Sequence, residues 1–232
     1  MADWLTAQEW DALRLSLRVA FWATLVSLPV ALFVAHALAR WRFPGHAVLN
    51  GLVHLPLVMP PVATGYLLLL TFGRRGWVGQ HLDQWFGIVL AFRWTGAVLA
   101  AAVMAFPLMV RAIRLSIEAV DPRLEQAAGS LGAARPWVWA TVTLPLILPG
   151  VIAGAMLAFA KAMGEFGATI TFVSNIPGQT QTLPLAIYSF LQVPGGEGAA
   201  ARLVAISIAL AMAALVASEV LARRVARRVA GR

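Results

Sequence analysis

The sequence predicts an all-α integral membrane protein with about five membrane-spanning helices. Of its 232 residues, 60% are hydrophobic and 12% are charged, whereas soluble domains average about 45–50% apolar and about 25% charged residues. The charges are also absent from two long stretches, residues 43–73 and residues 136–160. Runs of that length suit the roughly 20 apolar residues that cross a bilayer as a helix. A soluble fold is therefore excluded.

Five apolar segments are long enough to span a hydrocarbon core about 30 Å thick. Their expected bounds are residues 13–39, 48–72, 95–117, 138–160 and 203–222. The second and fourth segments lie inside the two charge-free stretches. Trp41, Trp94 and Trp137 stand at the ends of the first, third and fourth segments, as tryptophans do at membrane interfaces.

The distribution of positive charge predicts the orientation, because cytoplasmic loops carry an excess of Lys and Arg. Placing the C-terminus inside assigns eleven of the 18 basic residues to the cytoplasmic side: Arg40, Arg42, Arg111, Arg114, Arg123, Arg135, Arg223, Arg224, Arg227, Arg228 and Arg232. Six lie on the outer side, and Arg74 and Arg75 among them oppose the assignment. The N-terminus is therefore expected outside, with the basic tail 223–232 at the cytoplasmic headgroups.

Composition also limits the chemistry. The net charge of +8 arises from basic residues at the ends of apolar segments, which encodes topology and gives no reason to expect nucleic acid. The chain has no Cys and four scattered His, so neither a disulfide nor a metal site is expected. No cofactor is expected either.

Two connections are long enough to hold structure of their own. Residues 121–136 are polar and suit a short helix along the cytoplasmic surface. The connection 165–201 contains an apolar stretch, residues 183–193, that is too short to span and is expected to be re-entrant or interfacial. If that stretch crossed the membrane, the helix count would be six and the tail would lie outside. Residues 82–92 have a similar character.

Seven prolines fall inside the predicted spanning segments, where each removes a backbone donor and can kink its helix. The adjacent pair Pro60 and Pro61 lies in the middle of the second segment. Two lost donors at that depth indicate a broken helix, which membrane proteins use to line a path.

The most specific motif follows the third segment. Residues 124–132 read Leu-Glu-Gln-Ala-Ala-Gly-Ser-Leu-Gly, and after nine further residues come Val142, Thr143, Leu144 and Pro145. This pattern resembles the coupling motif of ATP-binding-cassette (ABC) importer permeases, in which Glu-Ala-Ala precedes a Gly by three residues and an Ile-x-Leu-Pro follows. The residues that occupy the motif columns are Ala127, Ala128, Gly132, Leu144 and Pro145, with Val142 in place of Ile. Gln126 stands in the Glu column, and Glu125 precedes it.

The resemblance covers residues 13–222 and implies the type I importer permease fold, with residues 121–145 as a cytoplasmic coupling loop. In that family the loop docks on an ATPase subunit, whose closure rocks the permease between outward-facing and inward-facing states. Because the chain lacks the GxxxxGK phosphate-binding motif, ATP hydrolysis is expected on a separate subunit. The resemblance further implies two ATPase subunits, a periplasmic oxyanion-binding protein and a second copy of this chain, in the bacterial inner membrane.

Two further stretches resemble permeases of the molybdate, sulfate and tungstate group, and the molybdate branch most. Residues 164–169 read Gly-Glu-Phe-Gly-Ala-Thr, and residues 174–184 read Ser-Asn-Ile-Pro-Gly-Gln-Thr-Gln-Thr-Leu-Pro. A crossing dianion needs donors that hold it weakly enough to release it. The candidates for the translocation path are Pro60, Pro61, Ser174, Asn175, Thr180 and Thr182, although the polar set also suits an ordinary turn. Glu165 is expected to cap a helix or pair with Lys161, with gating as the alternative.

Other functions stay open at this point. A sulfate, thiosulfate or tungstate permease would share these motifs. A channel or carrier without an ATPase is disfavoured by the Leu144-Pro145 spacing, and by the scarcity of carboxylates in the first three segments. A non-transporting membrane scaffold would leave the coupling loop unexplained.

Overall fold

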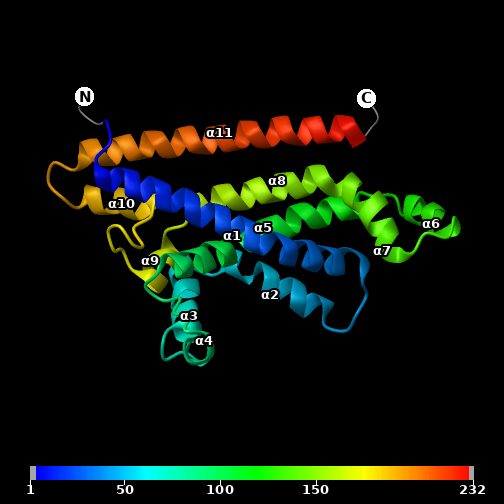
Figure 1. Cartoon of the computed structure of the whole chain (residues 1–232), viewed down its shortest axis with the longest axis horizontal. Helices are drawn as coiled ribbons and strands as arrows, with labels where there is room; N and C mark the ends of the chain where they lie inside the picture. The colour runs from blue at the N-terminus through cyan, green and yellow to red at the C-terminus, as the bar shows by residue number, and fades with distance from the viewer. Residues whose placement is uncertain (1–3, 230–232) are drawn as a thin grey trace.

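The computed structural model describes residues 4–229, and every regular element within them is helical. Four long helices lie side by side (Figure 1): α1 (Ala7–Arg40), α5 (Trp94–Glu118), α8 (Leu144–Met163) and α11 (Glu197–Val229). Each contains a stretch long and apolar enough to cross a membrane, and a bent pair of shorter helices between residues 46 and 72 gives a fifth. The prediction of an all-α protein with about five spanning helices is confirmed for the described residues.

Helix α5 is the central element, packed between α1 and α8. Its buried face consists mainly of small and unbranched side chains near its start and of larger aliphatic ones near its end: Ala97, Ala100, Ala101, Met104, Ala105, Met109, Val110, Ile113 and Ile117. Small residues let membrane helices approach closely. One such approach is at Gly150 of α8, where a Cβ atom would lie 1.6 Å from the Ser116 hydroxyl oxygen of α5.

Helix α1 begins at Ala7, six residues before the predicted start. The Thr6 hydroxyl accepts from the Glu9 backbone N–H at 3.3 Å, and the Glu9 carboxylate accepts from the Thr6 N–H at 2.6 Å. This capping box satisfies donors that a helix end leaves free. The fully buried Glu9 also pairs with Arg202 of α11 at 2.8 Å. The polar start of α1 is thereby tied to the last helix.

The second predicted segment is broken, as its proline pair indicates. Helix α2 (His46–Val58) and helix α3 (Pro61–Phe72) are bent by 116° relative to each other. The break falls at Met59 and Pro60, and Pro61 takes the first position of α3. A proline is tolerated there because the first helical N–H has no intrahelical partner.

The predicted surface helix is α6 (Pro122–Ser130). After a turn over residues 131–134, three helical elements follow one another without a gap: α7 (Arg135–Val138), the π-helical turn η1 (Trp139–Thr143) and α8. In η1 the Leu144 N–H donates to the Trp139 carbonyl, five residues back. Pro145 has no N–H to give to the carbonyl four residues earlier, and such π turns interrupt α-helices locally. The predicted segment 138–160 thus corresponds to a 29-residue span, Arg135–Met163.

The opposite end of the bundle is built from three short helices: α4 (Trp77–Phe86), α9 (Gly167–Val173) and α10 (Leu183–Leu191). Helix α10 occupies most of the stretch 183–193, and with nine residues it is too short to cross. Its first N–H donates to the Ser16 hydroxyl of α1 at 2.6 Å. Helix α10 packs on α11 and α1. Five crossings are therefore favoured over six.

The two ends of the chain lie at opposite ends of the bundle. Figure 1 shows the start of α1 near α10, whereas the end of α11 lies toward α6 and α7. Helix α11 continues to Val229, so the predicted basic tail begins inside this helix. Residues 230–232 of that tail lie outside the described part of the chain.

Candidate functional site

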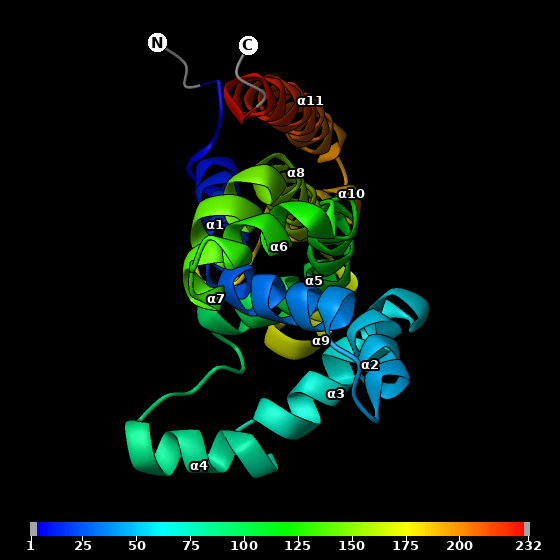
Figure 2. The same ribbon diagram turned by 90° about the vertical axis from the view of Figure 1, so that its right-hand side faces the viewer.

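Helix α6 lies across one end of the bundle, in front of the ends of the long helices when the molecule is viewed along them (Figure 2). The Asp121 carboxylate caps α6 by accepting from the Arg123 N–H at 2.9 Å, and Pro122 occupies the first helical position. The segment turns away after Leu131 at Gly132, whose φ of 88° is a left-handed conformation that favours glycine. The sequence thus fixes both ends of this short helix.

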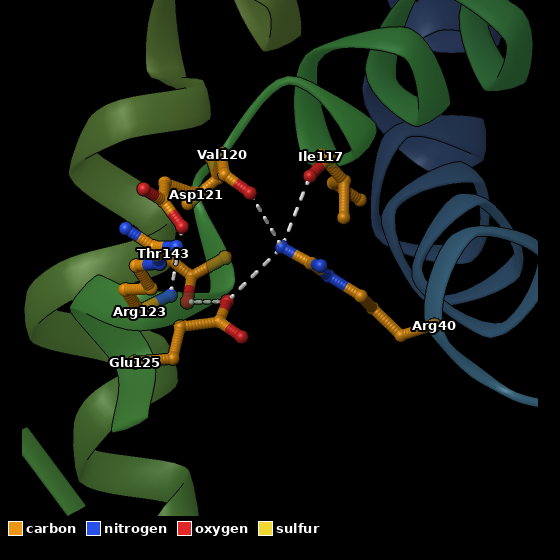
Figure 3. A network of polar contacts seen from close by, with 7 residues as sticks. All are labelled: Arg40, Ile117, Val120, Asp121, Arg123, Glu125 and Thr143. Carbon is orange, nitrogen blue, oxygen red and sulfur yellow. Dashed lines mark hydrogen bonds and ion pairs between the residues drawn. The ribbon is translucent and has the colours of Figure 1, made fainter. Parts of the chain in front are cut away.

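The acidic side chain of α6 points into the molecule. The Glu125 Oε1 atom accepts a hydrogen bond from the Thr143 hydroxyl of η1 at 2.7 Å. The same oxygen lies 3.5 Å from Nη2 of Arg40, the last residue of α1 (Figure 3). Glu125 therefore joins α6 to both α1 and the start of α8.

Arg40 connects this carboxylate to the central helix. Its Nη2 atom donates to the carbonyl oxygens of Ile117 at 3.1 Å and Val120 at 3.2 Å. Carbonyls at the end of a helix have no intrahelical donor, and a basic side chain can satisfy them. Arg40 thus caps α5 and links α1, α5 and α6 at one point.

The outer face of α6 is left exposed by residues 4–229. No side chain of α6 is buried, and both Gln126 and Ala127 are exposed while Ala128 is half-buried. Leu131, directly after the helix, is 89% exposed. Small residues on this exposed helix would let a partner helix approach closely.

A cavity of about 510 Å³ separates α6 from the bundle. Its walls come from the end of α1, from α6 and from the α7–η1 segment: His36, Arg40, Trp41, Pro122, Glu125, Gln126, Gly129, Ala133, Arg135, Val138, Trp139 and Thr143. Helix α6 is therefore held on the bundle through polar contacts around Glu125, and a packed apolar core does not lie beneath it.

The seven residues predicted for coupling lie together at this end of the molecule: Glu125, Gln126, Ala127, Ala128, Gly132, Leu144 and Pro145. Leu144 and Pro145 begin α8 directly after the π turn. Leu144 packs against the apolar cluster that includes Ile113 and Ile147. The motif thus extends from an exposed helix into the core of the bundle.

A second junction forms where two short helices, α3 and α9, meet. A Cβ atom on Gly65 of α3 would lie 2.5 Å from the Ala168 carbonyl oxygen of α9, and one on Gly167 would lie 2.7 Å from the Pro61 Cβ. The two glycines are therefore needed for the close approach of α3 and α9. Pro60 and Pro61 are exposed on the surface of this chain.

Glu165 has a structural role at this junction. The side chain is 2% exposed, and its Oε2 atom lies 2.7 Å from the Lys161 Nζ. The Oε1 atom accepts from the Ala168 N–H at 3.0 Å. The carboxylate thus both caps α9 and pairs with Lys161, which are the two structural roles expected from the sequence.

Two of the four polar candidates for the path, Thr180 and Asn175, have side chains engaged in hydrogen bonds. The buried Thr180 hydroxyl accepts from the Ile176 N–H at 3.0 Å and donates to the Ser174 carbonyl at 3.3 Å. The Asn175 amide donates to the Ser189 hydroxyl at 2.7 Å. The Thr182 hydroxyl is buried without a partner among the described residues. Thr180 therefore orders the loop, and Asn175 ties it to α10.

Several residues of these sites were not singled out from the sequence. Arg40 counted only toward orientation, and Thr143 lies unmarked between two motif positions. Arg111 and Arg114 were also counted only as cytoplasmic charges, but they lie in the last turns of α5. Long-range side-chain contacts of this kind leave no local pattern in one sequence.

Comparison with known proteins places the fold and the motif in one family. Residues 27–229 match the family described as binding-protein-dependent transport system inner membrane component. The molybdenum transport system permease protein ModB of Escherichia coli is 62% identical over 204 residues, which cover 88% of this chain and 89% of that protein. The sulfate transport system permease protein CysT of Salmonella typhimurium is 35% identical over 214 residues, covering 87% of this chain and 77% of that protein.

The fold is also similar to that of solved transporters. A bacterial alginate ABC transporter, in complex with its alginate pentasaccharide-bound periplasmic protein, contains a chain that matches with a TM-score of 0.76 at 16% identity, covering 96% of this chain and 81% of that one. The family match, the relatives and the helical architecture agree. The chain belongs to the binding-protein-dependent transport system inner membrane components, the multi-pass permeases of ABC importers.

Proposed function

We propose that this chain is the permease of an ATP-driven importer whose substrate is molybdate. The observation that carries the proposal is the 62% identity to a molybdenum transport permease over 88% of the chain. The sulfate permease relative is more distant, at 35% identity. Residues 13–222 would form the transport domain, with the basic segment 223–232 at the cytoplasmic headgroups.

The assembly would contain two copies of this chain, because one small bundle of five spans encloses no path by itself. A two-fold axis would place the path between the copies. Two ATPase subunits would bind the α6 surfaces, and a periplasmic oxyanion-binding protein would dock at the opposite end. This arrangement corresponds to an N-terminus outside and a C-terminus inside, because the end of α11 lies toward α6.

Movement of an ATPase would reach the bundle through α6. Because Glu125 contacts Thr143 and Arg40, a displacement of α6 acts on η1, on α1 and on the end of α5. The π turn is a second point at which the chain can adjust, since π turns interrupt the regular ladder. No atom of this chain takes part in ATP hydrolysis in this mechanism.

Transport by reconstituted complexes tests the proposal. The chain, its ATPase and its binding protein would be placed in proteoliposomes, and ATP-dependent uptake of molybdate would be measured with and without excess sulfate. Uptake that resists sulfate is the expected result. Uptake displaced by sulfate would keep the importer and change the substrate, and uptake without ATP would favour a carrier.

A further inference from the structure

A separate polar cavity lies between α2 and α5. It has a volume of about 280 Å³ and is lined by six residues: Asn50, His54, Arg111, Arg114, Leu115 and Glu118. None of these residues lines the cavity beneath α6. The coupling mechanism described above does not use them.

The side chains of this cavity are ordered by contacts among themselves. Arg114 Nε lies 2.7 Å from the Glu118 carboxylate, and Arg114 Nη1 donates to the Asn50 side-chain oxygen at 3.0 Å. The His54 Nδ1 atom is 2.8 Å from the Asn50 backbone carbonyl. With its oxygen occupied by Arg114, the Asn50 amide presents its N–H groups as donors.

Arg111 brings a second positive charge to the same cavity. Its side chain is exposed, and among the described residues it makes no ion pair or hydrogen bond. It lies seven residues before Glu118, the last residue of α5, which corresponds to about 10 Å along the helix axis. Two guanidinium groups and one carboxylate leave the cavity with an excess positive charge.

The position of this cavity on α5 argues against a lipid-facing surface. The adjacent face of α5 is fully buried at Val110, Ile113 and Ile117. Arg111 and Arg114 lie beside them on the side of α5 that faces α2, where Arg114 reaches Asn50. Arginines within membrane helices almost always face a bundle interior or a water-filled cavity, and they mark ion pathways.

An oxyanion also needs donors beyond those predicted from the sequence. The Thr180 and Asn175 side chains are already engaged in hydrogen bonds. Guanidinium groups offer several N–H donors in a planar fork that suits a tetrahedral oxyanion, and they remain charged at any physiological pH. Asn50, Arg111 and Arg114 supply such donors in one cavity.

We propose that Asn50, Arg111 and Arg114 form a transient binding site for a tetrahedral dianion on the half of the translocation path nearest α6. The inference rests on the proposed function, because a second copy must enclose the path. The Glu118 carboxylate already pairs with the Nε atom of the Arg114 guanidinium. This competing carboxylate weakens the hold on the dianion, so that it can leave.

Thiol labelling tests the site without requiring transport. The chain has no Cys, so Leu115→Cys would place a unique thiol in the cavity. In dodecyl maltoside, with the ATPase bound, an anionic methanethiosulfonate reagent would label this thiol. Molybdate is expected to slow the labelling. The control is Ile208→Cys on α11, which is 60% exposed and whose labelling molybdate should not change.

A second substitution separates the site from a general charge effect. Adding Arg111→Gln to Leu115→Cys should raise the molybdate concentration needed for protection about tenfold, which corresponds to the loss of one charge-assisted hydrogen bond. Arg42→Gln removes the same charge from the exposed α1–α2 loop and should leave protection unchanged. Equal protection in all three backgrounds would overturn the proposal.

Two further results distinguish a failure of this binding site from a failure of the proposed function. Protection by phosphatidylglycerol but not by molybdate would assign the cavity to a lipid phosphate and overturn the site. If Leu115→Cys does not fold, ATP-driven uptake decides: Arg111→Gln should lower it about tenfold at limiting substrate, and Arg111→Lys should restore part of it. Unchanged uptake by Arg111→Gln would contradict the site alone, whereas wild-type protein without uptake would contradict the importer.

Discussion

Two junctions in this protein join segments that are far apart in the sequence, and they are built in different ways. At the coupling end, long polar side chains bridge helices: Arg40 and Thr143 reach Glu125, and a cavity of about 510 Å³ lies beside them. At the junction of α3 and α9, Gly65 and Gly167 allow the two backbones to come into direct contact.

The difference indicates which junction moves and which holds its shape. Partly exposed hydrogen bonds and ion pairs can rearrange at small cost, because each contributes about 1 kcal/mol or less. Close packing of backbones cannot adjust continuously, since interiors are packed as densely as crystals. We therefore expect α6 to shift on the bundle while α3 and α9 move as one unit.

The largest loss of stability is expected from placing a side chain in the packed junction between α3 and α9. Gly65→Val places a side chain where even a Cβ atom would lie 2.5 Å from a backbone oxygen. Overpacking of this kind costs about 1–3 kcal/mol or more, so the variant should melt well below wild type in detergent. Gly51→Val is the control, because nothing lies within 4 Å of Gly51. Equal melting of the two variants would contradict a rigid junction.

Removing the Glu165 carboxylate at the same junction should cause the next largest loss of stability. Glu165→Ala leaves the Lys161 ammonium and the Ala168 N–H without their partner, at a cost of about 1–3 kcal/mol in the free energy of unfolding. Adding Lys161→Met should recover part of that loss, since the unpaired charge is then gone. A double variant no more stable than Glu165→Ala would show that the pair is not coupled.

At the coupling junction, stability and function should respond differently. Glu125→Gln removes a partly exposed ion pair, so the free energy of unfolding should change by less than about 1 kcal/mol. The amount of substrate imported per ATP hydrolysed should nevertheless fall. Glu219→Gln, which breaks an exposed ion pair with Arg223 on α11, is the matched control. A normal transport ratio in Glu125→Gln would remove this residue from the coupling route.

The smallest effect is expected at the end of α11. Ending the chain after Ala222 removes the predicted basic tail, and both Arg223 and Arg224 in that segment are exposed. Uptake should stay close to that of wild type, with at most a lower yield of inserted protein. Abolished uptake in a properly inserted variant would assign the tail a role beyond anchoring.

Much of this architecture could be predicted because it depends on local patterns. Long apolar segments located the spanning helices, and the Pro60-Pro61 pair located the break between α2 and α3. The spacing from Ala127 to Pro145 located the coupling segment. In each case the cause lies within a few turns of chain: hydrophobic length, missing backbone donors or a short motif.

The contacts within the sites depend instead on tertiary structure. Arg40 reaches Glu125 across 85 positions of sequence, and no local pattern specifies that pair. The polar residues of the loop 174–182 suited an anion by their chemistry. Thr180 instead bonds within the loop and Asn175 bonds Ser189 of α10, as buried polar groups generally do. Whether a hydrogen-bond donor is free to bind an anion depends on the tertiary structure.

The central claim, that α6 transmits the action of an ATPase, is tested most directly by comparing two glycines. Gly132 and Gly45 have φ values of 88° and 93°, and neither has an atom within 4 Å of an added Cβ. The same substitution, to Trp, therefore imposes similar backbone strain and no internal clash at either position. The measurement is ATP-driven molybdate uptake, with co-purification of the ATPase. Gly132→Trp should lose both while Gly45→Trp keeps them, and normal uptake by Gly132→Trp would contradict the claim.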